Sequence, residues 1–504
     1  MIFSAYFLKL HRQAFEGSKM MTRRLLQCIF SLTAGVIMLQ LFVDPYIGIA
    51  NNGDFERLMS PVGIAYRENP WAEENYDHYF WYYITNDFEF IEPAHNDWFS
   101  IAQFNMILSK WLCRMVSKTG FYDLRYLGAV NAAFYLGAFA LILYCISKQN
   151  KKWKIFIFGI LAAIFAIDGY VVQYMNSFFS EIVSLISTMF FLGFAWLIFL
   201  KKEKEHKMLL LFLMVVAGVF GAVNKQQDIL CIISVIFLAI CTILFAMELS
   251  RAGKIRACVT MSCVCLLLAL GLTILNKGAG NTCANVMLHD ILPETSEPVE
   301  SLEIMGFQGE EIKEVQAAFG SDTFSFEGPK VFEKYRSHFT RTNEAKVLLH
   351  EPEIIIKMIV NRAQYLFQDA PLGNFLEKDG IAPGAKSISF RSWFNVKSRL
   401  YQSSFAFYIT VILLSVAISL IQIKKGTKAY CIVLSMALSN ILRYLTIILG
   451  DRSNDDIKHF FMVNVEFDVL LICVVLSFAI SVLGRFLSGE HSGRFRKIFK
   501  KSPV

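Results

Sequence analysis

Long apolar runs separated by short polar stretches dominate the hydrophobic pattern of this chain. A helix that crosses a hydrocarbon core of roughly 30 Å needs about 17 to 25 mostly apolar residues. Ten runs meet this requirement: 25–43, 127–147, 154–170, 181–200, 208–223, 229–247, 257–275, 404–423, 429–449 and 463–484. The pattern predicts an all-α polytopic membrane protein with about ten transmembrane helices in a single domain, 25–484.

Lysine and arginine are unevenly distributed among the segments that join these runs. If successive spans alternate in direction, the basic segments all fall on one side of the membrane; they are 1–24, 148–154, 201–207, 251–256, 424–428 and 485–504. Basic residues collect in cytoplasmic loops of membrane proteins. We therefore expect a multi-pass protein of the cell membrane in which the N-terminal tail 1–24 and the basic tail 485–504 are both cytoplasmic.

Two long segments, 44–126 and 276–403, then fall on the extracytoplasmic side. Each contains a stretch with apolar residues at helical spacing, 98–118 in the first and 351–369 in the second. The first stretch has tryptophan and cations at its edges, which is typical of a helix that lies in the membrane interface. We predict two folded outer loops that carry amphipathic helices.

Composition supports the membrane assignment and narrows the function. The chain is 55% hydrophobic and 18% charged, too few charges to cover a soluble protein of 504 residues. Its net charge of +7 follows from the cytoplasmic basic loops, so it gives no reason to expect a nucleic-acid partner. The 11 cysteines form no C-x-x-C pair, and neither a disulfide framework nor a zinc site is expected.

Polar residues gather at the outer ends of the predicted spans. Asn51-Asn52-Gly53-Asp54 follows the first span and has the composition of a turn, but it also places a carboxylate at the membrane edge. Such a carboxylate can act as a general base that takes a proton from an acceptor hydroxyl. Ionisable residues at membrane depth are costly and tend to mark functional sites or ion pairs. Asp54 is the candidate catalytic base.

Other outer turns supply candidate partners for Asp54. Asp168 and Glu181 bracket the turn after the third span. Glu181 either caps the helix that it opens or serves with Asp168 as an acid in an acceptor site, and a divalent cation shared with Asp54 is a further alternative. Lys225 in the next outer turn and Arg452 in the last one are candidates for stabilising a departing phosphate.

Arg443 and Asp468 lie at similar depths in consecutive spans, so we predict a structural ion pair between them.

Several short motifs resemble the GT-C superfamily of polytopic glycosyltransferases, which carry an acidic residue in the first outer loop. Within it they are similar to bacterial hexose transferases of S-layer and cell-surface glycan assembly. The motifs are Asn52-Gly53-Asp54-Phe55, Asn176-Ser177-Phe178-Phe179-Ser180-Glu181 and Asn285-Val286-Met287. The resemblance implies inverting transfer of a hexose from a polyprenyl-phosphate donor to a glycan or glycolipid acceptor on the extracytoplasmic side.

The resemblance also implies roles for particular residues. Asp54 would be the catalytic base. Substrate contacts or supporting acids would be Asn52, Arg57, Asp168, Tyr170, Asn176 and Glu181, and phosphate contacts would be Lys225, Gln226 and Arg452. No cofactor is assigned.

Two other functional classes stay open. A transporter or flippase of a lipid-linked glycan also has many spans and intramembrane charges, but such proteins often show internal repeats, and none is visible in this chain. An acyltransferase or glycan ligase of similar architecture is the other class. The acyltransferase would need a catalytic histidine, and the candidates His289, His350 and His459 lack an adjacent acidic motif that would orient a base.

Overall fold

Each of the ten predicted spans coincides with an apolar helix in the computed structural model, which describes residues 2–94, 99–149, 152–201, 205–275, 280–319, 331–378, 380–400, 404–450 and 456–487. These helices are α1 (Ile2–Phe42), α5 (Arg125–Ser147), α6 (Lys152–Ala166), α8 (Glu181–Leu200), α9 (Lys207–Val223), α10 (Ile232–Ala246), α11 (Arg251–Leu275), α19 (Phe405–Lys424), α20 (Cys431–Gly450) and α22 (Phe461–Leu487). The protein is a polytopic all-α membrane protein, as predicted.

Not all ten helices are long enough to cross a membrane unaided. Within the described ranges, eight are long and apolar enough, and a ninth span results if α6 is joined to α7 (Gly169–Val172) and η2 (Gln173–Met175) across a bend of 48°. The bend falls where Asp168 interrupts the apolar run and caps α7 through the N–H of Tyr170. The remaining helix, α9, is apolar but has only 17 residues, and among the described residues no adjoining short helix lengthens it as η3 lengthens α10.

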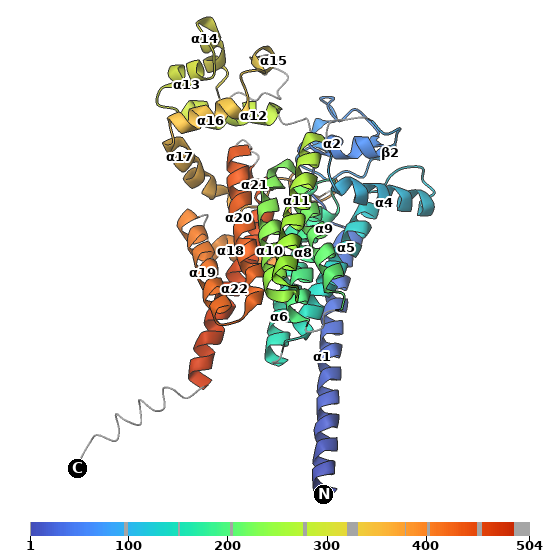
Figure 1. Cartoon of the computed structure of the whole chain (residues 1–504). Helices are drawn as coiled ribbons and strands as arrows, with labels where there is room; N and C mark the ends of the chain where they lie inside the picture. The colour runs from blue at the N-terminus through green and yellow to red at the C-terminus, as the bar shows by residue number, and fades with distance from the viewer. Residues whose placement is uncertain are drawn as a thin grey trace, which may run out of the picture.

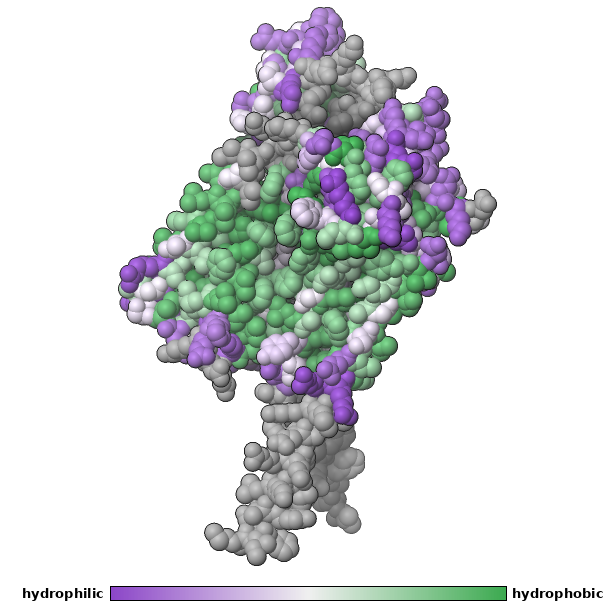
Figure 2. All heavy atoms as spheres, turned by 90° about the vertical axis from the view of Figure 1, so that its right-hand side faces the viewer, coloured by the Kyte–Doolittle hydropathy of each residue, from purple (hydrophilic) through white to green (hydrophobic). Residues whose placement is uncertain are grey.

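The two ends of the bundle differ in what they carry. Figure 1 shows the start of α1 and the end of α22 at one end, which we call the terminal end, and the two long connecting segments at the other, the loop end. Figure 2 shows a broad hydrophobic belt over the bundle below the hydrophilic surface of the loop end. Both chain ends thus leave the same side of the bundle; that this side is the cytoplasm stays a prediction.

The helices of the bundle pack around continuous apolar cores. In the N-terminal half, α8 packs against both α5 and α9, and α1 packs against α5 and α6. In the C-terminal half, α19, α20 and α22 contact one another. The two halves meet where α20 packs against α10 and the short helix η3 (Gln226–Cys231).

The first long segment forms a small cap at the loop end. Its elements are α2 (Phe55–Met59), η1 (Ser60–Val62), β1 (Ile64–Tyr66), α3 (Tyr76–Tyr79), β2 (Phe88–Phe90) and α4 (Ala102–Val116). Strands β1 and β2 pair antiparallel, with Ile64 opposite Phe90. The cap carries the Asn51–Asp54 turn directly above the end of α1.

Helix α4 runs across the bundle axis (Figure 1) and has an inverted polarity. Its polar residues Asn105, Ser109 and Lys110 are buried against the protein, whereas its large apolar residues are exposed: Phe104, Ile107, Leu108, Trp111 and Met115. Lys110 donates hydrogen bonds to the backbone oxygens of Val62 (2.7 Å) and Gly63 (3.0 Å). The helix is therefore amphipathic, as predicted, with its apolar face exposed. Such a face is typical of a helix in the membrane interface, and that position stays a prediction.

The second long segment contains a helical subdomain whose apolar core is continuous with that of α19, α20 and α22. Its elements are α12 (Gly280–Val286), η4 (Met287–Ile291), η5 (Leu292–Glu294), α13 (Pro298–Ile304), α14 (Glu310–Ala317), α15 (Val331–Tyr335), α16 (Arg341–His350), α17 (Glu353–Arg362) and η6 (Ala363–Tyr365). Glu351 links its two ends by accepting hydrogen bonds from the backbone N–H and the hydroxyl of Ser296, both at 2.8 Å. These hydrogen bonds lower the pKa of Glu351.

The end of the second segment does not stay outside the bundle, contrary to the prediction of an outer loop over 276–403. Helix α18 (Ser392–Leu400) packs against α6, and Lys397 is buried there with Nζ 3.0 Å from the carboxylate of Asp468 in α22. The Asp468 partner explains this: a buried lysine is tolerated when it is paired with a carboxylate.

Candidate active site

The turn that carries Asp54 is built around the side chain of Asn51. The Asn51 Oδ1 accepts hydrogen bonds from the N–H groups of Gly53 (2.9 Å) and Phe55 (3.2 Å), and its Nδ2 donates to the phenol oxygen of Tyr66 (2.6 Å). Gly53 has φ +102°, a conformation that other residues resist. The turn predicted from Asn-Asn-Gly-Asp is therefore confirmed, and it places Asp54 at the start of α2.

Phe55 fixes the turn against the bundle. Its ring packs edge-on against Phe178 and Phe179, with centroids 5.3 and 4.8 Å apart. Both partners belong to the Asn176–Glu181 motif that precedes α8. Two of the motifs that carried the family resemblance are thus in direct contact.

Asp54 lies between two cations. Its carboxylate forms ion pairs with Arg57, one turn further along α2, and with Lys458 in the short helix α21 (Asp456–His459). The Asp54 side chain is 20% exposed, whereas Lys458 is 4% exposed and lies 5.0 Å over the ring of Phe179. The Asp54 carboxylate is therefore accessible to solvent on one side and is paired with the buried Lys458 on the other.

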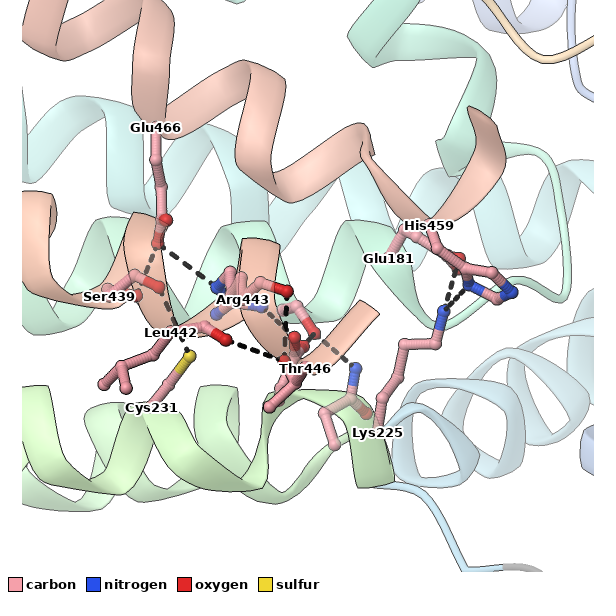
Figure 3. A network of polar contacts seen from close by, with 12 residues as sticks. Glu181, Lys225, Cys231, Ser439, Leu442, Arg443, Thr446, His459 and Glu466 are labelled. Carbon is pink, nitrogen blue, oxygen red and sulfur yellow. Dashed lines mark hydrogen bonds and ion pairs between the residues drawn. The ribbon is translucent and has the colours of Figure 1, made fainter. Parts of the chain in front are cut away.

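A second carboxylate and cation lie beside this pair. Lys225 Nζ is 2.7 Å from Glu181 Oε1 and 3.1 Å from Nδ1 of His459, as Figure 3 shows. Glu181 is 3% exposed and Lys225 is 19% exposed. Because a lysine ammonium is a donor only, Nδ1 of His459 accepts, which leaves the imidazole proton on Nε2.

Helix α21 joins the two pairs, because Lys458 and His459 are adjacent in sequence. Asp54, Glu181 and Lys225, which are far apart in the chain, therefore belong to one polar cluster at the loop end. In the contacts described above, Arg57, Lys225 and Lys458 surround the two carboxylates of Asp54 and Glu181. Cations grouped in this way raise the local concentration of anions that approach from solvent.

The position of Lys225 depends on its neighbour Asn224, which is buried. Asn224 Nδ2 donates to the backbone oxygen of Ser180 (2.7 Å) and to the hydroxyl of Ser184 (2.9 Å). Its Oδ1 accepts from the Ser100 hydroxyl (2.7 Å) and the Ala102 N–H (3.1 Å). One side chain thus ties the Lys225 turn to both α8 and α4.

Asp168 and Tyr170 lie in a different place. The carboxylate of Asp168 accepts hydrogen bonds from the N–H groups of Tyr170 (2.9 Å) and Phe394 (3.0 Å), so it holds the bend after α6 against α18. The Tyr170 ring stacks on Phe394 with centroids 4.7 Å apart, and its hydroxyl accepts from Asn464. Within the described residues, no three His, Cys, Asp or Glu side chains are grouped as a metal site, so Asp54, Asp168 and Glu181 do not form one.

Of the remaining predicted site residues, Asn176 has a structural role, Asn52 and Gln226 lie beside the cluster residues, and Arg452 is not described. Asn176 is buried, and its Nδ2 donates to the backbone oxygens of Leu41 (3.0 Å) and Ile47 (2.9 Å), which joins the end of α1 to the turn before α8. Asn52 is half-buried in the Asp54 turn, and Gln226 begins η3 next to Lys225. Arg452 lies outside the described residues.

The predicted pair between Arg443 and Asp468 is wrong. Arg443 pairs with Asp228 in η3, and its Nε lies 3.3 Å from Oε1 of Glu466, while Asp468 pairs with Lys397. Residues 466 and 468 are at similar depth, but two helical positions turn the side chain by about 200°. Glu466 therefore faces α20, and Asp468 faces α18.

Lys458 was missed by the sequence interpretation. Its contact with Asp54 joins residues 404 positions apart, which no local pattern reveals. A signal was nevertheless present, because Lys225 and Lys458 both lie in segments on the side predicted to be extracytoplasmic, where basic residues are sparse. A lysine in such a short outer loop predicts a carboxylate partner nearby.

The bundle of long apolar helices defines a class, the polytopic α-helical membrane proteins. Residues 13–491 match the model of a family described as the YfdI N-terminal transmembrane domain, and because this match spans nearly the whole chain, the protein belongs to that family. Neither the curated proteins nor the solved structures contain a match.

Proposed function

We propose that this protein is a membrane glycosyltransferase that moves a hexose from a polyprenyl-phosphate donor to a cell-surface glycan or glycolipid, such as a precursor of an S-layer glycan, on the extracytoplasmic side. The observation that carries the proposal is the polar cluster at the loop end. It combines a partly exposed carboxylate, Asp54, with Lys225 and Lys458 at the loop end of the bundle. A lipid-linked donor requires this combination of a base, cations and membrane proximity.

In this proposal Asp54 accepts the proton of the acceptor hydroxyl as its oxygen attacks the anomeric carbon of the donor sugar. The bond between that carbon and the phosphate oxygen breaks, and polyprenyl phosphate leaves with the bonding electrons. Lys225, with Arg57 alongside, stabilises the negative charge that develops on the leaving phosphate. Attack opposite the leaving group inverts the anomeric configuration.

The proposal is tested by transfer of a radiolabelled hexose from its polyprenyl phosphate to an envelope glycolipid fraction, with protein in lipid nanodiscs. Asp54→Asn should reduce the rate of transfer by about 10² to 10⁴, the usual contribution of a general base. The matched control is Asp44→Asn, which removes an exposed carboxylate earlier in the same loop and should leave the rate unchanged. A folded Asp54→Asn protein with full activity would refute the assignment.

A transporter or flippase of a lipid-linked glycan is the second candidate. The observation that favours it is the set of charged residues buried inside the bundle, Asp228, Arg443 and Glu466, since intramembrane charges often mark transport pathways. Sealed vesicles distinguish the two functions. A flippase moves labelled lipid-linked sugar between leaflets without an acceptor, whereas a transferase forms a new glycosidic bond and needs the acceptor.

A further inference from the structure

A second polar group lies deep in the bundle, away from the Asp54 cluster. It consists of Asp228 in η3, Arg443 in α20 and Glu466 in α22, which meet where α20 packs against η3 and α22. Figure 3 shows the contact between Arg443 and Glu466. Arg443 contacts both carboxylates, and its side chain and that of Glu466 are almost completely buried. The group is enclosed by apolar helices, so its charges interact strongly.

The charges of this group do not balance. Arg443 is one cation, and Asp228 and Glu466 are two carboxylates. The other titratable side chains that face the group are the thiol of Cys231 and the phenol of Tyr408, which are neutral donors. The nearest further cation along η3, Lys225, is 2.7 Å from Glu181 and serves that carboxylate. With both carboxylates ionised, the group would hold one negative charge inside the bundle.

The two carboxylates differ in their hydrogen bonds. Asp228 is bonded on both oxygens, since Oδ1 pairs with Arg443 and Oδ2 accepts from the Ser184 hydroxyl at 3.2 Å. Glu466 is hydrogen-bonded on one oxygen only. Its Oε1 accepts from the Ser439 hydroxyl at 2.8 Å, while its buried Oε2 has no hydrogen-bond partner among the described residues. An ionised oxygen without a donor is costly in such surroundings.

A cavity adjoins Glu466. It has a volume of about 20 Å³ and is lined by Glu466, Arg443 and the hydroxyl-bearing residues Ser234, Ser435 and Ser439, among others. That is room for roughly one water molecule, and the lining offers enough polar groups to hold it. A metal ion would need several oxygen ligands around it, whereas a proton needs only Oε2.

We propose that Glu466 carries a proton at neutral pH and donates its Oε2–H to a water molecule in this cavity, which makes the group an intramembrane proton-binding site. Protonation removes the surplus negative charge and gives Oε2 a hydrogen to donate. Asp468, two residues further along α22, provides the contrast. It is equally buried and also has one oxygen, Oδ1, without a hydrogen-bond partner among the described residues, but Lys397 at 3.0 Å balances its charge one-to-one.

Infrared spectroscopy of the reconstituted protein at neutral pH tests this assignment. The difference spectrum of wild type minus Glu466→Gln should contain the carbonyl-stretch band of a protonated carboxylic acid, and this band should shift in D₂O. The difference spectrum of wild type minus Asp468→Asn should contain a carboxylate band and no acid band. The proposal is overturned if Glu466→Gln removes a carboxylate band, if wild type has no acid band, or if the acid band appears only when sodium is withdrawn.

Thermal unfolding provides an independent readout. Glu466→Gln replaces a neutral acid by a neutral amide of the same shape, so the melting temperature should hardly change. Asp468→Asn leaves Lys397 buried without its counter-charge and should lower the melting temperature clearly. Equal losses of melting temperature in the two variants would contradict the proposal.

Discussion

The Glu181–Lys225 pair offers a quantitative test of how the candidate active site is held together. Removing Lys225 as Lys225→Met leaves the Glu181 carboxylate 97% buried and without its closest cation. Breaking a fully buried pair costs about 3 to 5 kcal/mol, but Lys225 is partly exposed and Lys458 and His459 stay nearby, so we expect a loss of about 2 to 3 kcal/mol in the free energy of unfolding.

The reverse substitution should cost less. In Glu181→Gln the lysine is left alone, but its flexible chain can turn its ammonium toward solvent, so we expect a loss of about 1 kcal/mol. The double variant removes both charges and should be more stable than Lys225→Met alone. The pair would then show a coupling energy of about 1 to 2 kcal/mol.

Unfolding in mixed detergent micelles, followed by circular dichroism, measures these four free energies. Lys313→Met is the matched surface control, because Lys313 and Glu310 form an ion pair of similar length, 2.8 Å, with both side chains largely exposed. This control should change the stability little. If Lys225→Met is no more destabilising than Lys313→Met, or if the double variant loses the full sum of the single losses, the cluster is not held by this pair.

Three further outcomes follow from other parts of the molecule. Gly128→Ala should destabilise the protein by about 1 to 3 kcal/mol because the new Cβ would lie 1.9 Å from the amide oxygen of a buried asparagine, whereas Gly137→Ala in the same helix meets nothing closer than 3.6 Å and should be tolerated in thermal unfolding. The pKa of Glu351 is lowered in the folded protein, so its carboxylate stabilises the fold above about pH 4.3, and this stabilisation is lost as the pH falls through the folded-state pKa. Hydrogen exchange in α17 should accelerate over that pH range in the wild type, and Glu351→Gln should show no such acceleration. In vesicles with brominated acyl chains, the quenching lost in Trp111→Phe should exceed that lost in Trp71→Phe, and equal losses would place α4 outside the bilayer.

Much of the fold could be predicted from hydropathy, because each span must bury a continuous apolar surface in lipid. The run 181–200 coincides with α8, and the run 25–43 agrees closely with Thr22–Phe42, the part of α1 that is apolar enough to span a membrane. The prediction was less accurate where tertiary packing determines the path of the chain. The run 154–170 bends at Asp168. Helix α18 enters the bundle although its sequence is no more apolar than that of other outer segments. A bend or a re-entry depends on distant partners, such as Phe394 and Asp468, that no local window contains.

The candidate site was predictable in part. Grouping polar residues by the end of the bundle at which they lie brought Asp54, Glu181 and Lys225 together, and the structure places all three in one cluster. The depth of a residue along its helix could be derived from the sequence, but the neighbouring helix toward which its side chain points could not. For this reason Asp168 was grouped with the cluster although it caps a helix, and Arg443 was paired with the wrong acid.

The short helix α21 has a consequence for how the protein is made. Its residues Lys458 and His459 connect the Asp54 turn to the Glu181–Lys225 pair through polar contacts, and they precede the last span of the chain. Asp54 is translated with the first loop, but its lysine partner follows only after some 400 further residues. The candidate site is therefore completed late in synthesis, and a chain that stops before α21 holds Asp54 paired with Arg57 but without Lys458.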